Sequence, residues 1–533
     1  MSWAHLSIAF AVIVAESACA QLLELGLADE LFISGVRAFI QLTLLGFILH
    51  PIFAADHPCV VLGYIFGFMI LVSAYEAVAR PKVTYPGMFR DGVYSLGVSV
   101  LLMGSLLLTV VTPTPWYNAQ YLIPLAGMLI NNSLSGVALA LNQMIDYLTT
   151  NREYLEVLLA FGASPWEAAW PGFAKSAQAA LIPAINGMNV LGLVSIPGMM
   201  TGQILGGASP LKAAKYQIVI TFFISGCTFM AVASTCAFTI RAFFDKRGRH
   251  DTSNLVKQSR LKVAQWVDPR AWKATRRKPP SSPTSAAKEP LLGNAAESGE
   301  SFGPRLCWVA APGSAPGAGG ATPQQGSAVL DLDMEGVVGG SRAMTAAFRV
   351  HTQEVACVMG PSGIGKSTLL KWICDLVPAR RATMRLRGQS SETLSAQAWR
   401  RDVLYVHQSK APLPGTPAEL LKTVRKLKAQ RGHAMGDPEA IMRSVGLDGA
   451  LLERPWGDLS GGEAQRTMLS IALSTSPACL LLDEPTSALD DVSKGLVEQA
   501  LKASSSSIML VTHDEAQAAR LGASVFRIAA AEH

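Results

Sequence analysis

One short stretch constrains this chain more than any other part of it. Residues 360–368 read GPSGIGKST and fit the pattern G-x-x-x-x-G-K-[ST] without a mismatch. An apolar run over 355–359 precedes the stretch and another over 369–373 follows it, so it joins a predicted buried strand to a predicted helix. Backbone N–H groups in such a loop, together with the helix N-terminus, bind phosphate groups. The chain is therefore predicted to bind a nucleoside triphosphate.

The residue types of this loop fit that task. Its glycines let the backbone turn towards the phosphates, Lys366 can reach the terminal phosphates, and Ser367 can ligate magnesium. An ordinary glycine-rich turn is the alternative, and the Lys-Ser pair in register after a strand argues against it. The predicted nucleotide-binding residues of the loop are Gly360, Pro361, Ser362, Gly363, Ile364, Gly365, Lys366, Ser367 and Thr368.

Composition divides the chain into two unlike halves. Hydrophobic residues make up 50% of it and the mean hydropathy is +0.29, too apolar for an ordinary soluble enzyme, and the excess lies before residue 245. The formal charge is +6, with basic residues concentrated in 246–288. We interpret that region as a membrane-proximal segment attracted to anionic lipid, not as a nucleic-acid-binding surface. The eight cysteines form no C-x-x-C pair, which argues against a zinc site or a disulfide framework.

Apolar segments in the first half recur at about the 20 residues that a bilayer requires. An odd number of spans, with the nucleotide-binding half in the cytosol, places the N-terminus outside, and most loop Lys and Arg residues agree. Lys212 and Lys215 fall on the wrong side, so either they are tolerated there or residues 197–207 are re-entrant. The seven predicted spans are 4–25, 31–54, 59–79, 92–113, 120–142, 182–207 and 216–241.

Several polar side chains fall inside these spans, where lipid makes them costly. Either they line a central pathway or they form hydrogen bonds between helices, and both interpretations stay open. Glu16 and Arg37 are possible partners. Pro197 and the glycines at 198, 202 and 206 predict a seam where two helices pack closely. The polar residues are Glu16, Arg37, Gln41, Glu76, Asn131, Asn132, Asn186, Asn189 and Gln203.

Residues 153–175 lie between two spans and differ from both. A helix is predicted to end at Gly162 and to restart after Ser164 and Pro165, because Ser caps a helix and Pro fits its first turn. A short helix on the cytosolic face is what a membrane domain needs to dock into a groove on an ATPase. This loop resembles the coupling loops of ABC transporter permeases.

Four longer stretches make a family resemblance specific, at residues 35–49, 123–139, 158–169 and 180–222. They resemble the FetB family of permeases, which includes bacterial iron exporters and the membrane subunits of plant aluminium-tolerance ABC transporters. The resemblance covers essentially all of residues 5–245. It implies a membrane subunit that pairs with a separate FetA-type ATPase, and here the two are predicted to be fused.

The predicted domains follow from these boundaries. Residues 1–245 form the FetB-like permease domain, 246–328 a flexible linker rich in Pro, Ser, Ala and Gly, and 329–533 the ATPase domain. Such a linker lacks the apolar area that would offset its ordering entropy. Within it, residues 261–272 are predicted to form a short interfacial helix. Residues 412–458 of the ATPase domain are predicted to form a helical subdomain.

Residues 459–463 read LSGGE. Locally, Ser460 and Glu463 form an S-x-x-E capping box, so the alternative is simply a good helix start. Together with the phosphate loop, the stretch resembles the signature of ABC ATPases, in which the helix N-terminus binds the γ-phosphate held by the opposite subunit. Ser460, Gly461 and Gly462 are therefore predicted to bind nucleotide, and the resemblance implies a homodimer.

Residues 479–482 form an apolar strand that ends in Asp483 and Glu484. Both carboxylates then lie at the carboxyl edge of a parallel sheet, where nucleotides bind. Asp483 is predicted to hold magnesium together with Ser367. Glu484 is predicted to orient or deprotonate the water that attacks the γ-phosphate.

Three further matches complete the resemblance to ABC ATPases. Gln408 follows a predicted strand and matches the Q-loop, whose amide contacts magnesium or the attacking water. His513 matches the switch histidine, and residues 487–490 match the D-loop, which communicates across the dimer. The predicted catalytic residues are Glu484, His513 and Gln408, and the predicted metal ligands are Ser367, Gln408 and Asp483.

One departure concerns the base of the nucleotide. ABC ATPases usually stack adenine on an aromatic side chain about 25 residues before the phosphate loop. Residues 329–347 contain no aromatic residue. The sequence therefore predicts hydrolysis without predicting selectivity for adenine.

The sequence as a whole predicts a multi-domain protein, with a polytopic α-helical membrane domain followed by an α/β P-loop NTPase (ABC ATPase) domain. We expect an integral membrane half-transporter that acts as a homodimer, uses ATP and Mg²⁺, faces the cytosol with its ATPase domain and contacts membrane lipid but no nucleic acid. From the resemblance, it exports iron or another metal ion. The alternatives are a transporter of nucleotide sugars linked to aluminium tolerance, and an ATP-gated channel or regulatory membrane protein.

Overall fold

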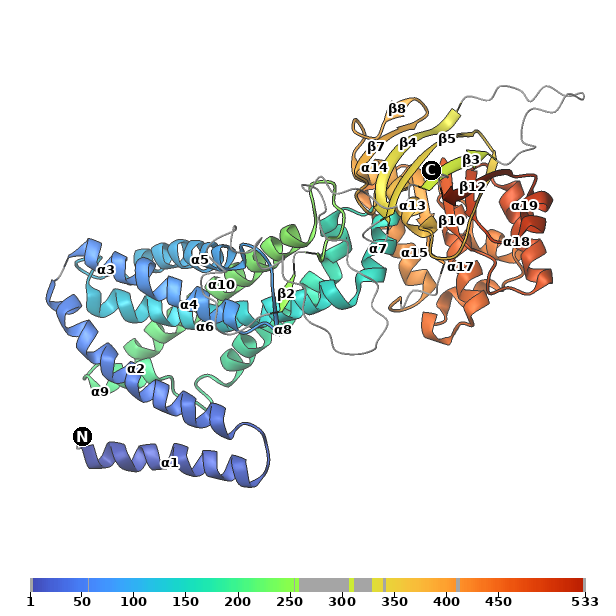
Figure 1. The fold of residues 1–533 in the computed structure, drawn as a ribbon. Helices are drawn as coiled ribbons and strands as arrows, with labels where there is room; N and C mark the ends of the chain where they lie inside the picture. The colour runs from blue at the N-terminus through green and yellow to red at the C-terminus, as the bar shows by residue number, and fades with distance from the viewer. Residues whose placement is uncertain are drawn as a thin grey trace, which may run out of the picture. The chain divides into compact units, whose positions relative to one another are not determined.

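The computed structural model describes residues 3–55, 57–253, 255–257, 306–310, 328–338, 342–408 and 413–530. The chain forms two compact units (Figure 1). One comprises residues 1–78, 92–137 and 181–232, and the other comprises residues 79–91, 138–180 and 233–533.

Apolar helices make up the first half of the chain. A π-helical turn, Ile65–Met69, joins two of them, α3 and α4, into one continuous segment. The helices are α1 (Trp3–Leu22), α2 (Ala28–Ala55), α3 (Pro58–Tyr64), α4 (Ile70–Ala79), α5 (Met88–Val111), α6 (Ala119–Thr150), α7 (Arg152–Ala160), α8 (Pro165–Val190), α9 (Gly198–Leu205) and α10 (Pro210–Phe243).

Among the described residues, five helical segments are long and apolar enough to cross a bilayer. Each overlaps one predicted span, and the first predicted span, 4–25, coincides with α1. The five segments are 28–55, 58–79, 88–111, 119–150 and 210–243.

The predicted span at 182–207 is not a continuous helix. The helix α8 ends at Val190, and α9 then covers only eight residues, about 12 Å of rise, far less than a bilayer's thickness. Gly192 has a φ of 79°, and Pro197 lacks the N–H that would continue a helix. Average hydropathy does not register these breaks. Residues 182–207 therefore do not form one continuous spanning helix, which agrees with the alternative that residues 197–207 are re-entrant.

Two predicted contacts within the membrane half also differ. Arg37 forms its ion pair with Glu76 on α4, not with Glu16. The predicted glycine seam is not formed within the described chain, because a Cβ added at Gly198 or Gly202 would meet no described atom within 4 Å.

The ATPase half is built on one mixed sheet. In the described residues its strands lie in the order β8-β7-β4-β5-β3-β12-β6-β11-β10-β9. The last five run parallel to one another, and the strands β6, β9, β10 and β11 are almost completely buried, as expected for a parallel sheet covered on both faces. The strands are β3 (Leu306–Ala310), β4 (Ala328–Val338), β5 (Arg342–His351), β6 (Val355–Met359), β7 (Arg381–Leu386), β8 (Gln389–Ser390), β9 (Val403–Val406), β10 (Cys479–Asp483), β11 (Ser507–Val511) and β12 (Ser524–Ala530).

Helices and short 3₁₀ turns complete this half. The predicted helical subdomain is confirmed, and its predicted apolar face, Leu420, Leu421, Val424 and Leu427, is buried. The helices are α13 (Lys366–Ile373), α14 (Ala396–Asp402), α15 (Pro417–Lys426), α16 (Pro438–Ser444), α17 (Gly461–Ser474), α18 (Asp491–Ala503) and α19 (Glu515–Leu521), and the 3₁₀ turns are η2 (Lys428–Gln430), η3 (Gly449–Glu453) and η4 (Trp456–Asp458).

The predicted break in the loop helix is confirmed. The helix α7 ends at Ala160, Gly162 takes the left-handed conformation at a φ of 88°, and α8 starts at Pro165. Ser164 and Glu167 bond to each other in both directions across the first turn of α8, which fixes the restart.

Most of the predicted flexible linker, 246–328, lies outside the described residues, and two of its described segments are strands. The strand β2 (Val256–Lys257) pairs with β1 (Val83–Thr84), and β3 pairs with β12 in the ATPase sheet. The interpretation of the basic region as lipid-facing is wrong for Arg247 and Arg249, which form ion pairs with Asp375. The predicted interfacial helix at 261–272 lies outside the described residues.

Candidate active site

The phosphate loop has the conformation that its glycines predict. Gly363 and Gly365 have φ values of 74° and 108°, and a Cβ at Gly365 would collide with Val338. Lys366, which is 6% exposed, donates hydrogen bonds to the carbonyls of Gly360 (2.8 Å) and Pro361 (3.0 Å). Burial lowers the pKa of this lysine. The loop therefore holds its ammonium group at the N-terminus of α13, where phosphate would bind.

The predicted catalytic side chains converge at the carboxyl edge of the parallel sheet. Nε2 of His513 lies 3.0 Å from the Lys366 ammonium and 3.1 Å from Oε1 of Glu484. The side-chain amide of Gln408 donates a 2.6 Å hydrogen bond to Oε2 of Glu484. These residues follow β6, β9, β10 and β11, so the parallel order of the strands brings them together.

Asp483 is the last residue of β10 and is 2% exposed. Its Oδ2 accepts a hydrogen bond from the hydroxyl of Tyr405, at 3.2 Å. Burial, reinforced by the Asp483 charge, raises the pKa of Tyr405 well above its usual value, so this phenol stays a donor. Tyr405 was not among the residues predicted from the sequence, although its polar hydroxyl within an otherwise apolar strand was a usable signal.

The predicted metal ligands fit Mg²⁺ chemically. Ser367, Gln408 and Asp483 offer a hydroxyl, an amide and a carboxylate oxygen, the hard donors that Mg²⁺ prefers. Gln408 uses its NH₂ group on Glu484, which leaves its carbonyl oxygen for a cation. Mg²⁺ held by these residues would supply positive charge that neutralises the charge of the phosphate groups.

Glu484 has an unusual backbone, with a φ of 48°. Its N–H donates to the carbonyl of Val511 at 3.1 Å. Its carbonyl accepts from the side-chain amide of Gln465 at 3.0 Å and from the hydroxyl of Ser487 at 3.0 Å. Such a conformation costs about 1 kcal/mol or more and persists only where neighbours fix it. Gln465, which was also not predicted from the sequence, is one of these neighbours.

The signature stretch forms a helix N-terminus. Ser460 is the N-cap of α17, and its capping box with Glu463 is present in both directions. Ser460 and Gly461 are exposed, and Gly462 lies against Leu489. The positive end of this helix is thus accessible to an anion.

Residues 329–347, which precede the phosphate loop, offer no aromatic ring on which a base could stack. The ring of Trp372 on α13 packs against Gly336 of β4 so closely that a Cβ there would overlap it. Trp372 is 2% exposed and therefore belongs to the core.

The helix α7 packs on the ATPase half through an apolar face and one ion pair. Its buried residues include Leu155, Leu158 and Leu159. The carboxylate of Glu156 accepts from Lys371 of α13 at 3.0 Å and from Arg152 at 2.9 Å.

The turn after α7 adds backbone contacts. The carbonyl of Phe161 accepts from the Gln430 amide at 3.0 Å, and Glu167 accepts from the N–H of Lys428 at 2.8 Å. A Cβ at Gly162 would lie 2.8 Å from the carbonyl oxygen of Gln397, so the backbones touch there.

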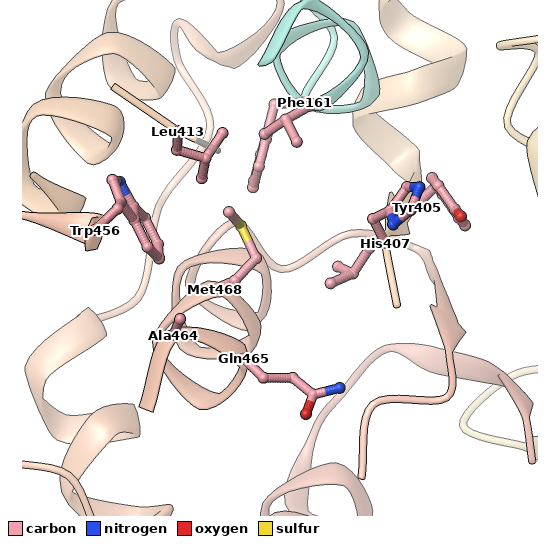
Figure 2. Close-up of a pocket in the computed structure, with 10 residues that line it drawn as sticks. Phe161, Tyr405, His407, Leu413, Trp456, Ala464, Gln465 and Met468 are labelled. Atoms are coloured by element: carbon pink, nitrogen blue, oxygen red, sulfur yellow. The ribbon is translucent and has the colours of Figure 1, made fainter. Parts of the chain in front are cut away.

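A small cavity of about 40 Å³ lies beneath this turn. Figure 2 shows the Phe161 ring pointing towards Met468 of α17, with Trp456 on one side and Tyr405 and His407 on the other. Gln465, which holds the Glu484 carbonyl, also lines this cavity. The cavity beneath the docked turn is therefore lined by a residue that bonds to the backbone of Glu484, the predicted hydrolytic residue.

Two family models match the chain. One, described as "Uncharacterised protein family (UPF0014)", matches residues 3–244, and the other, described as "ABC transporter", matches residues 344–487. Both resemblances predicted from the sequence are thus confirmed.

Three relatives match the first half. The UPF0014 membrane protein slr1647 of Synechocystis is 33% identical, over 46% of this chain and 95% of that protein. Protein ALUMINUM SENSITIVE 3 of Arabidopsis thaliana is 34% identical, over 40% and 76%. The probable iron export permease protein FetB of Escherichia coli is 30% identical, over 44% and 89%. The chain belongs to the UPF0014 family of membrane proteins and carries an ABC transporter ATPase domain in the same polypeptide, so it is an ATP-hydrolysing ABC transporter with its permease and ATPase fused.

Proposed function

We propose that two copies of this chain form an exporter of iron or another metal ion. The main support for a metal-ion cargo is the 30% identity to the probable iron export permease over 89% of that protein's length. The ATPase half supplies the driving reaction, because a carboxylate, a histidine and a lysine meet beside the phosphate loop.

The dimer follows from the signature helix. Its N-terminus is exposed at Ser460 and Gly461 and carries a partial positive charge suited to a γ-phosphate. We place each ATP between residues 360–368 of one chain and 459–463 of the other, with both ATPase halves in the cytosol. Glu484 then orients or deprotonates the attacking water, and Lys366 and His513 contact the γ-phosphate.

Closing this sandwich would move the two α7 helices, because each is bound to its own ATPase half through Glu156 and Lys371. That movement would switch the side on which the permease opens, and hydrolysis would reset it.

A second cargo class has its own support. The identity of 34% to Protein ALUMINUM SENSITIVE 3 covers 76% of that protein and favours a role in aluminium tolerance. The cargo for that role is the nucleotide sugar that the family resemblance in the sequence implies. An ATP-gated channel would not need the Glu484, His513 and Gln408 arrangement.

The test is ATP hydrolysis by the full chain reconstituted in liposomes, measured with Fe²⁺, other divalent metals, Al³⁺ and nucleotide sugars. A rate stimulated by Fe²⁺, with Fe²⁺ accumulating on the side opposite the ATPase, supports the proposal. Stimulation by nucleotide sugars alone supports the second candidate. Ion flux that continues in the Glu484→Gln variant would contradict both and indicate a channel.

A further inference from the structure

The segment that follows α10 forms a compact turn, residues 244–251, which we call the basic turn. Phe244 and His250 form an antiparallel bridge across it, and Gly248 takes a φ of 69°. The carboxylate of Asp245 accepts from the backbone N–H groups of Arg247 (2.9 Å) and Arg249 (2.8 Å). The turn thus fixes its own backbone and presents two guanidinium groups in one direction.

Both guanidinium groups bind one buried carboxylate. Asp375 follows α13, and its side chain is 2% exposed. Its Oδ2 accepts from Nε of Arg247 at 2.9 Å, and its Oδ1 accepts from Nε and Nη2 of Arg249 at 2.8 and 2.5 Å. A buried carboxylate is stable only where it is paired, so Asp375 depends on the basic turn.

A buried arginine of the ATPase binds the turn in return. Arg400 on α14 has no exposed surface. Its guanidinium donates to the carbonyls of Gly248 (3.2 Å) and Arg247 (3.1 Å), and also to that of Asp375 (2.7 Å). The contact is therefore reciprocal. Cations of the basic turn bind a carboxylate of the ATPase half, and a cation of the ATPase half binds backbone carbonyls of the turn.

The helix α13 links this contact to the nucleotide site. The phosphate loop caps the N-terminus of α13, whereas Asp375 and Lys371 lie at its C-terminal end. An α-helix of eight residues is only about 12 Å long and rises as a rigid unit. The phosphate site thus lies at one end of this short helix. At the other end, Lys371 contacts α7 and Asp375 contacts the basic turn.

We propose that the basic turn is a second coupling element, which anchors the permease half to the phosphate-loop helix through Asp375 and Arg400. It acts beside α7, and it begins where the UPF0014 match, residues 3–244, ends. Arg247 and Arg249 are positioning residues, since they act on bound nucleotide through α13. The inference does not depend on which cargo is transported.

The test uses the full chain with a protease recognition sequence inserted after Ser285. After purification in detergent and cleavage, size-exclusion chromatography measures how much ATPase half stays with the membrane half. Wild-type halves should stay together. The R247A/R249A variant should dissociate with a constant about 30-fold larger or more, because truncating partners of a buried charge is costly. The matched control, R276A/R277A, removes two arginines outside the turn and should behave as wild type.

Further measurements separate docking from misfolding. ATP affinity of the uncleaved R247A/R249A chain should equal that of the wild type, while its kcat for ATP hydrolysis in liposomes changes. If that chain does not bind ATP, the triple variant R247A/R249A/D375N decides, because it removes the buried carboxylate charge that the double variant leaves without its two arginines, and its halves should still separate. R247K/R249K should restore only part of the association, because lysine lacks the guanidinium fork. Halves that remain together in an ATP-binding R247A/R249A or triple variant would overturn the proposal.

Discussion

The side-chain amide of Gln465 donates a hydrogen bond to the backbone carbonyl of Glu484, with 3.0 Å between nitrogen and oxygen. Gln465 therefore connects the cavity beneath Phe161 to the left-handed residue that carries the predicted hydrolytic carboxylate. The contact matters because a non-glycine residue keeps a φ of 48° only while its neighbours hold it there.

Replacing Gln465 with Leu should slow ATP hydrolysis about tenfold, which corresponds to the roughly 1.4 kcal/mol of one well-placed hydrogen bond. ATP affinity should stay unchanged, because the hydrogen bond of Gln465 goes to the backbone of Glu484 and not to the phosphate loop. Steady-state kinetics that separate kcat from KM provide the measurement. Ser487→Ala is the comparison, since it removes a second donor to the same carbonyl without touching the cavity. An unchanged kcat in Gln465→Leu would show that this bond does not position Glu484.

Glu484→Gln should lower the hydrolysis rate by at least about 100-fold while ATP still binds, because the amide keeps the shape of the side chain but cannot accept a proton. The ATP-bound dimer should then accumulate. Light scattering of the detergent-solubilised protein with and without ATP would detect it. Turnover at the wild-type rate would mean that another residue acts on the water.

Gly162→Ala should uncouple α7 from the ATPase half. The change adds left-handed strain of about 1 kcal/mol and places a methyl group 2.8 Å from the Gln397 carbonyl oxygen. Stimulation of hydrolysis by cargo should be lost, whereas basal hydrolysis should persist.

Gly432→Ala is the matched control for that prediction. Gly432 has a similar φ of 82°, but a Cβ there meets no described atom within 4 Å. The control therefore carries the backbone strain without the collision. Equal loss of stimulation in both variants would assign the effect to strain and not to docking.

Acid should weaken the docking of α7. Burial alone would raise the pKa of Glu156, but Lys371 and Arg152 lower it by more, so the folded pKa lies below the ordinary value of 4.5. The ion pair therefore contributes its full stability above about pH 4.5, and that contribution is lost as the pH falls through the folded pKa.

Thermal unfolding of the wild type and of Glu156→Gln in detergent between pH 7 and pH 3 tests this dependence. The variant should unfold at a lower temperature at pH 7, and the gap should narrow in acid. Glu153→Gln, on the exposed side of the same helix, should follow the wild type throughout. A gap that stays constant with pH would contradict the prediction.

The nucleotide site could be predicted from the sequence because each of its motifs is recognisable within a few consecutive residues. Each motif follows a short apolar strand, and parallel strands bring their carboxyl ends to one edge, so Glu484 and His513 had to meet near Lys366. Gln465 was missed because its target is a backbone carbonyl, which no side-chain pattern marks.

The errors concern partners that are distant in the sequence. Arg249 and Asp375 are 126 residues apart, so the sequence did not show that they are partners. The basic residues after α10 were therefore interpreted as binding anionic lipid at the membrane surface. The choice of Glu76 over Glu16 for Arg37 depends on which helices are neighbours, which hydropathy does not reveal. Helix breaks at Gly192 and Pro197 were visible, but the averaged apolar character of the segment outweighed them.

The pairing of Arg247 and Arg249 with Asp375 bears on why the two halves share one polypeptide. If this contact already joins them, the intervening residues need not transmit force, and two separately encoded proteins could assemble by the same contact. Fusion would then set the amounts in which the two domains are produced and would have no part in the transport mechanism. Every membrane domain is then synthesised together with one ATPase domain. The proposed dimer of two chains therefore always contains two ATPase domains.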